Sequence, residues 1–162
     1  MRKLSWCVAA AGLIASPSAF ALCTLLCTCT VTTTSLQFGT YNPLAHADVV
    51  STAKVLVKCG GVVGLAIPLT VYLGPGNGTV ASRLMASGAN RLQYGLYADP
   101  TFTVPLGDGT QGTVTIAGNV DLDLLGLSPG LEYTMFGRIP SRQVTTPPGV
   151  YADAIPVTLE FY

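Results

Sequence analysis

The strongest constraint on the fold of this chain is a repeated alternation of apolar and polar residues. In residues 49–59, for example, Val55 and Val57 alternate with Lys54 and Lys58. Because successive side chains of a β-strand point to opposite faces, a period of two is typical of strands with one face in a core. The same alternation recurs in residues 67–73, 92–97, 120–124, 131–139 and 154–162.

Turn-forming residues separate these segments. Gly-Pro-Gly-Asn-Gly occupies residues 74–78, and further glycine and proline turns fall at residues 108–109, 128–130 and 147–149. No stretch has the pattern of a helix of about ten residues or more, although residues 80–89 are compatible with a helical turn. Many short strands divided by turns predict an all-β, antiparallel sandwich or barrel.

The composition excludes several classes of protein. Of the 162 residues, 49% are hydrophobic and 10% are charged, against about 25% charged in ordinary soluble domains. This balance argues against intrinsic disorder, which needs low hydrophobicity and high charge. The net charge is zero, so the chain lacks the excess of positive charge that is typical of nucleic-acid-binding proteins. With a single histidine, a histidine-based metal site or catalytic triad is not expected, and we expect no cofactor.

The first 21 residues have the features of a secretory signal peptide. Arg2 and Lys3 precede a mostly apolar stretch at residues 4–15, and Ala19-Phe20-Ala21 is a small-x-small cleavage site. Cleavage there leaves residues 22–162, a length that suits one domain. No later apolar run is long enough for a membrane span. We therefore expect export of a single domain without a transmembrane segment.

The cysteines of an exported chain indicate disulfide bonds. Cys7 lies in the signal peptide, which leaves Cys23, Cys27, Cys29 and Cys59. Their spacing differs from the paired motifs of zinc sites, and spacing alone does not choose the pairing. We favour Cys29–Cys59, which closes the largest useful loop beside a regular strand; a local Cys23–Cys27 bridge is the second candidate.

Residues 154–162 form the last alternating segment. Its apolar face consists of Ile155, Val157, Leu159 and Phe161. A strand this apolar must pair on both sides within its sheet or present an edge that another chain can pair with. The pattern alone leaves both possibilities open.

Several short motifs, in their order and spacing, resemble the spore coat protein U domain family, which includes Csu-type pilus subunits of archaic chaperone–usher systems. The resemblance extends from about Cys29 to Tyr162. The motifs are Cys-x-Val at 29–31, Leu-Gln-Phe-Gly-Thr-Tyr-Asn-Pro at 36–43, Arg-Leu-Met at 83–85, Leu-Gln-Tyr-Gly-Leu-Tyr-Ala-Asp at 92–99, Gly-Asp-Gly-Thr at 107–110, Tyr-Thr-Met-Phe-Gly-Arg-Ile-Pro at 133–140 with Gln143, Pro-Gly-x-Tyr-x-Asp at 148–153, and residues 157–162.

The resemblance implies an immunoglobulin-like sandwich that lacks its final strand. In the family, a periplasmic chaperone fills the gap, and an outer-membrane usher exchanges that strand for the N-terminal extension of the next subunit. The product is a surface fibre for attachment and biofilm formation. Ile155, Val157, Leu159 and Phe161 would line the acceptor groove. Residues 22–28 would be the N-terminal extension, with Leu22, Thr24 and Leu26 as the alternating donor positions, although this segment is short for a donor strand.

Two other functions remain as alternatives. The first is a self-contained spore-coat or carbohydrate-binding module that does not polymerise and uses Tyr72, Tyr97 and Tyr151 at loop tips. The second is an enzyme built on His46 or on the carboxylates of Asp121 and Asp123. Since an exposed loop histidine and a solvated strand face explain these residues better than catalytic roles do, we expect no enzyme.

Overall fold

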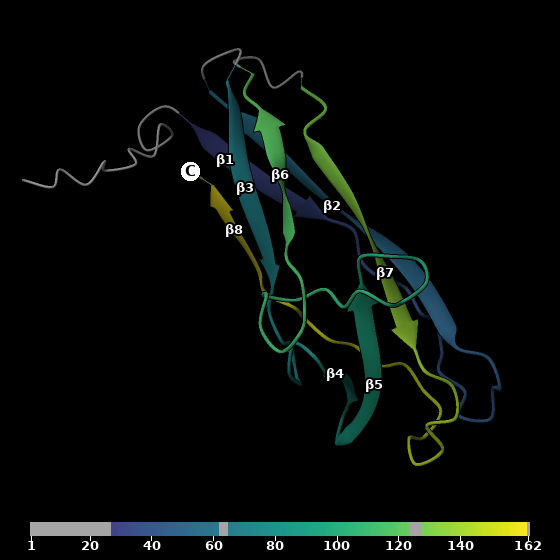
Figure 1. The fold of residues 1–162 in the computed structure, drawn as a ribbon. Coiled ribbons are helices and arrows are strands. Elements are labelled where there is room, and N and C mark those ends of the chain that lie inside the picture. Colours follow the sequence, from purple (N-terminus) through teal and green to yellow (C-terminus); the bar gives the residue numbers. More distant parts are fainter. Residues whose placement is uncertain (1–26, 62–64, 124–127, 162) are drawn as a thin grey trace, which may run out of the picture.

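The computed structural model describes residues 27–61, 65–123 and 128–161. The expected signal peptide and the donor positions Leu22, Thr24 and Leu26 lie outside these residues, as does Cys23. Within the described residues the chain forms β-strands and no α-helix (Figure 1). The strands are β1 (Thr28–Thr33), β2 (Val49–Gly60), β3 (Ala66–Leu73), β4 (Arg83–Ser87), β5 (Asn90–Tyr97), β6 (Ile116–Asp121), β7 (Leu131–Ile139) and β8 (Val157–Phe161).

The strands form two antiparallel sheets that pack as a sandwich. One sheet has five strands in the order β1-β2-β7-β5-β4, and the other has three in the order β6-β3-β8. The pairing of β2 with β7 runs from Val49↔Ile139 to Val57↔Leu131 and forms the centre of the larger sheet. The predicted all-β sandwich is confirmed, and the barrel alternative is wrong.

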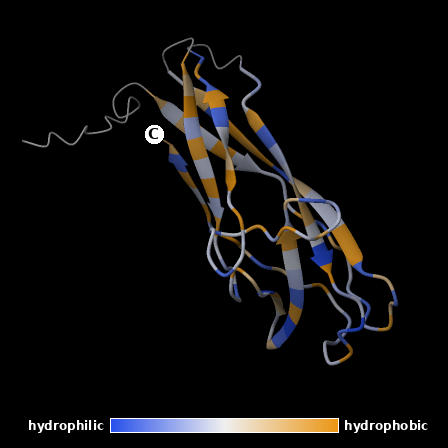
Figure 2. Cartoon of the chain, in the orientation of Figure 1, coloured by the Kyte–Doolittle hydropathy of each residue, from blue (hydrophilic) through white to orange (hydrophobic). Residues whose placement is uncertain are grey.

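Side chains from both sheets fill the core between them. Apolar bands repeat along the strands (Figure 2), and in β3 the side chains of Ile67, Leu69, Val71 and Leu73 are all buried. This burial follows from the alternation of the sequence, because every second residue points to the same face. The rest of the core comes mainly from β2, β5, β6 and β7.

One local expectation is wrong. Residues 80–89, compatible in sequence with a helical turn, contain the strand β4 instead, which pairs with β5 from Arg83↔Tyr94 to Ser87↔Asn90. Gly88 has a φ of +58° in the turn between these strands, a conformation that glycine adopts without strain. The tight turn brings two short strands together, and pairing then overrides the weak helical pattern.

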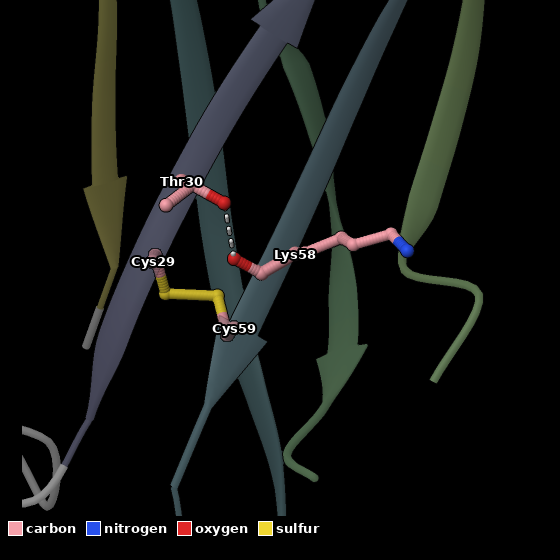
Figure 3. Close-up of a disulfide and its surroundings, with 4 residues drawn as sticks. All are labelled: Cys29, Thr30, Lys58 and Cys59. Atoms are coloured by element: carbon pink, nitrogen blue, oxygen red, sulfur yellow. Dashed lines mark hydrogen bonds between the residues drawn. A yellow bond between two sulfur atoms is a disulfide. The ribbon is translucent and has the colours of Figure 1, made fainter. Parts of the chain in front are cut away.

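The favoured disulfide is present. Cys29 of β1 is bonded to Cys59 of β2, and the two residues are direct partners in the strand register, with 4.1 Å between their Cα atoms (Figure 3). The bond ties β1, an edge strand of the larger sheet, to its neighbour β2. Cys27 is also disulfide-bonded, and Cys23, its expected partner, lies outside the described residues.

Candidate strand-accepting groove

The last strand lies at the edge of the smaller sheet. Within the described residues β8 pairs only with β3, in a register that sets Val157 opposite Leu73, Leu159 opposite Val71 and Phe161 opposite Leu69. The apolar face predicted for this segment therefore points toward the core. The strand itself begins at Val157, so Ile155 lies in the segment that leads into it.

The two partner strands differ in burial although their apolar residues face the same way. Leu69, Val71 and Leu73 of β3 are at most 2% exposed, whereas Val157 of β8 is 36% exposed. Leu159 and Phe161 are half-buried against the core. An apolar edge strand of this kind can pair with another chain.

A cavity of about 590 Å³ opens beside the start of β8. Its floor consists of Leu73, Met85, Tyr94, Leu96 and Met135, which belong to both sheets. Its two walls are residues 33–40 on one side and residues 150–157 on the other. Of the predicted groove residues, Ile155 and Val157 line this cavity, while Leu159 and Phe161 continue the apolar face along β8.

The first wall follows β1, one of the two edge strands of the larger sheet. The Thr34 N–H donates to the carbonyl of Lys54, and the Gln37 N–H donates to the hydroxyl of Ser51. Leu36 and Phe38 pack over Gly137, where an added Cβ would lie 2.6 Å from the Phe38 ring. Because β1 and β8 end their respective sheets on the same side of the molecule (Figures 1 and 3), the cavity lies where the two edges approach each other.

The second wall consists of Val157 at the start of β8 and of a strap, residues 149–156, that crosses from the larger sheet to the smaller one. Gly149 exchanges backbone hydrogen bonds with Tyr41, and Ala152 does so with Ala86 of β4. The Gly74 N–H, just after β3, donates to the carbonyl of Pro156. These contacts fix the strap at both of its ends.

Asp153 sits in the strap and accepts hydrogen bonds from β5 and from the turn between β3 and β4. Its Oδ1 accepts from the backbone N–H and the Nδ2 of Asn77, and its Oδ2 accepts from the hydroxyl of Tyr94 at 2.7 Å. Burial and this hydrogen bond to Asp153 raise the pKa of Tyr94, so the hydroxyl stays protonated and donates.

Arg83, the first residue of β4, is almost completely buried. Its guanidinium donates to the carbonyls of Gly74, Leu73 and Leu106. Burial lowers the pKa of this guanidinium, while Tyr94, Asp153 and Asp108 act in the opposite direction; an arginine remains charged in proteins. In the sequence, Arg83 and Asp153 stand out only as parts of the family motifs, and no local pattern predicts their roles.

The tyrosines of the binding-module alternative lie apart from one another. Tyr72 of β3 donates to Glu160 of β8, and Tyr97 packs edge-on against Phe102. Tyr151 donates to the carbonyl of Pro147 and also lines the cavity. Tyr72 and Tyr97 belong to β3 and β5, so the expected loop positions are wrong for these two, whereas Tyr151 lies outside the strands; all three side chains are half-buried.

The residues of the enzyme alternative are also dispersed. His46 is exposed in the loop before β2, and Asp121 is exposed at the end of β6. Asp123 accepts a hydrogen bond from the Ser128 N–H. The parts of the chain that the structure describes contain no cluster of three or more potential metal ligands and no helix with the length and apolar character of a membrane span.

The fold and the groove together define a class of structure: a β-sandwich whose last strand has an open apolar edge. The model of the Spore Coat Protein U domain family matches residues 17–158, and the chain belongs to this family. The family predicted from the sequence motifs is thereby confirmed.

A solved structure shares the fold. It is the crystal structure of the CsuC–CsuE chaperone–tip adhesion subunit pre-assembly complex from the archaic chaperone–usher Csu pili of Acinetobacter baumannii. The matched chain is 22% identical, with a TM-score of 0.53 over 84% of the present chain. The present chain covers only 40% of that matched chain. No curated protein matches significantly.

Proposed function

We propose that this protein is a subunit of a surface pilus that is completed by a β-strand from another polypeptide. The observation that carries the proposal is the open edge of β8 beside the cavity of about 590 Å³. Membership of the Spore Coat Protein U domain family and the shared fold with a chain of a pilus pre-assembly complex support it.

An added strand would meet two requirements of this edge. Its backbone would bond to the backbone groups of β8 that point away from β3, and its alternate side chains would fill the cavity, as in other cases of strand addition. Val157, Leu159 and Phe161 would lie beside the inward side chains of the added strand, with Ile155 at the entrance. Because head-to-tail addition uses different surfaces on the two subunits, it builds an open fibre rather than a closed dimer.

The role implies specific partners and a route. A signal peptide at residues 1–21 would direct the chain to the periplasm, where a pilus chaperone would supply the first strand. An outer-membrane usher would then exchange that strand for one from a neighbouring subunit. We propose that the resulting fibre serves attachment and biofilm formation at the cell surface, a role that needs no catalytic residue.

The domain itself would comprise residues 22–162, with residues 22–28 as its N-terminal extension. Thr28 is already paired with Gly60 at the start of β1, so only the residues before it are available to act as a donor. Leu22, Thr24 and Leu26 remain the proposed donor positions, and Cys23–Cys27 remains the proposed second disulfide.

Assembly on the cell surface tests the proposal. The chain is expressed with the chaperone and usher of its system, surface material is sheared off, and unboiled and boiled samples are compared on SDS gels. We expect a ladder of multimers without boiling that collapses to the monomer on boiling. A single monomer band in both lanes, from well-folded protein, would favour the self-contained coat or carbohydrate-binding module.

Adjacent residues of β8 supply matched variants. Val157 faces the groove and Thr158 faces away from it, and both are exposed. Val157→Lys places a charge where the added strand must pack, so the ladder should disappear while the monomer stays folded. Thr158→Lys should leave the ladder intact. Equal ladders from both variants would contradict strand addition at this edge.

A further inference from the structure

Arg83 joins the two sheets at the groove by polar contacts. It belongs to β4 of the larger sheet, yet its guanidinium donates to the carbonyls of Leu73 and Gly74 at the end of β3 in the smaller sheet. The Leu73 side chain is part of the cavity floor. Arg83 therefore holds one element of that floor from the opposite sheet.

Asp153 makes a second connection from the strap. Through Tyr94 it is bonded to β5 of the larger sheet, and through Asn77 it is bonded to the turn that follows β3 of the smaller sheet. Tyr94 and Asp153 both line the cavity. The carboxylate thus links β5 of the larger sheet to the connection between β3 and β4, at the wall where a strand would enter.

The turn after β3 is shaped to admit this carboxylate. Gly76 has a φ of +65°, and a Cβ at this position would lie 2.2 Å from Oδ2 of Asp153. A Cβ at Gly74 would lie 2.6 Å from the ring of Pro156 in the same strap. Only a turn without side chains at these two positions allows the strap to approach so closely.

We propose that Arg83, Tyr94 and Asp153 form a clasp, a set of positioning residues that keeps the groove open before the donor strand arrives. The proposal rests on the proposed function. An unfilled apolar cavity favours collapse of the surrounding residues, and apolar contacts alone are non-directional. Directional hydrogen bonds across the sheets oppose that collapse, and a preformed groove binds with a smaller ordering cost.

Removing the hydroxyl group of Tyr94 tests whether the clasp keeps the groove open. Tyr94→Phe deletes the hydrogen bond to Asp153 and keeps the ring against the core. Tyr97→Phe is the control, since it deletes a hydroxyl from the same strand at a position that does not line the cavity. The probe is a fluorescent peptide of about ten alternating valine and threonine residues with terminal lysines, whose binding to the purified full chain is followed by anisotropy.

For Tyr94→Phe we expect the association rate to fall on the order of tenfold, the effect of losing a hydrogen bond to a charged group. The dissociation rate should stay within about twofold, because the bound strand then holds the sheets apart. The control should bind like the wild type. Asn77→Ala, an exposed change with little effect on folding, should slow association in the same way but less strongly.

A purely structural role gives a different result. Tyr94→Phe would then lower the melting temperature equally with and without the peptide, and both rate constants would match the wild type; this outcome overturns the clasp alone. Failure of the wild-type chain to bind the peptide contradicts the strand-accepting groove itself, and the clasp proposal falls with it.

Discussion

At the scale of single residues, Asp48 and Arg138 form the better protected of the two ion pairs in the described part of the chain. The Nε of Arg138 donates to Oδ2 of Asp48 at 2.6 Å, and the Ser141 N–H donates to Oδ1. The hydrogen bond from Ser141, together with the Arg138 guanidinium, lowers the pKa of Asp48 even though partial burial acts to raise it. The pair anchors the loop before β2 to the end of β7.

Asp48→Asn should therefore reduce stability in a pH-dependent way. A carboxyl group whose pKa is lowered by folding stabilises the native state above its unfolded pKa, and this contribution disappears as the pH falls through the folded pKa. Urea unfolding at neutral pH should show a loss of about 1 kcal/mol, since the pair is partly exposed. The difference should shrink below about pH 4. A constant difference down to low pH, or an equal loss in Asp121→Asn, would contradict this account.

Residue patterns in the sequence predicted which residues form the core, but they did not predict which residues make the polar contacts. Alternation identified the buried face of β3, because burial on a strand follows a local period. The bonds of Asp153 join residues 76 and 59 positions apart, so no local pattern encodes them. Only the glycines of residues 74–78 could have indicated that another segment approaches that turn closely.

At the scale of elements, β1 depends on the Cys29–Cys59 bond because it pairs with β2 on one side only. Replacing both cysteines by serine should cost about 2–4 kcal/mol in unfolding free energy. The β1 amides should lose protection from hydrogen exchange before those of β2 and β7. Thr30→Ala is the control, since it deletes only a 3.4 Å contact from the hydroxyl to the Lys58 carbonyl (Figure 3). Equal losses in both variants, or unchanged β1 protection without the disulfide, would contradict this role.

The positions of most strands could be predicted from the sequence, but the residues at which they end could not. The short strand β4 could not be predicted either. The strand expected from residue 154 onward begins only at Val157, because Pro156 and the strap contacts precede it. The strand expected at 120–124 is shifted to Ile116–Asp121. Its pairing with β3 includes Gly118 and Asn119, residues that interrupt an apolar alternation. Tertiary pairing therefore decides these boundaries.

At the scale of the whole molecule, the arrangement of sheets creates the groove. The cavity floor contains residues of β3, β4, β5 and β7, which are far apart in the sequence and meet only because the two sheets pack face to face. The sequence motifs predicted the family, whereas the pattern of the last apolar segment left open whether this strand would lie inside a sheet or at its edge. The size of the cavity and its two walls depend on the complete topology, which no single segment specifies.

Amide hydrogen exchange of β8 is the most direct test of whether this strand has an open edge that accepts another strand. In the isolated chain, the β8 amides that point away from β3 should exchange rapidly, while those of β2 and β7 at the centre of the larger sheet stay protected. Addition of the alternating peptide should protect the same β8 amides and leave those of β2 unchanged. Protection of every β8 amide in the isolated chain, with no further change on adding the peptide, would contradict a strand-accepting edge.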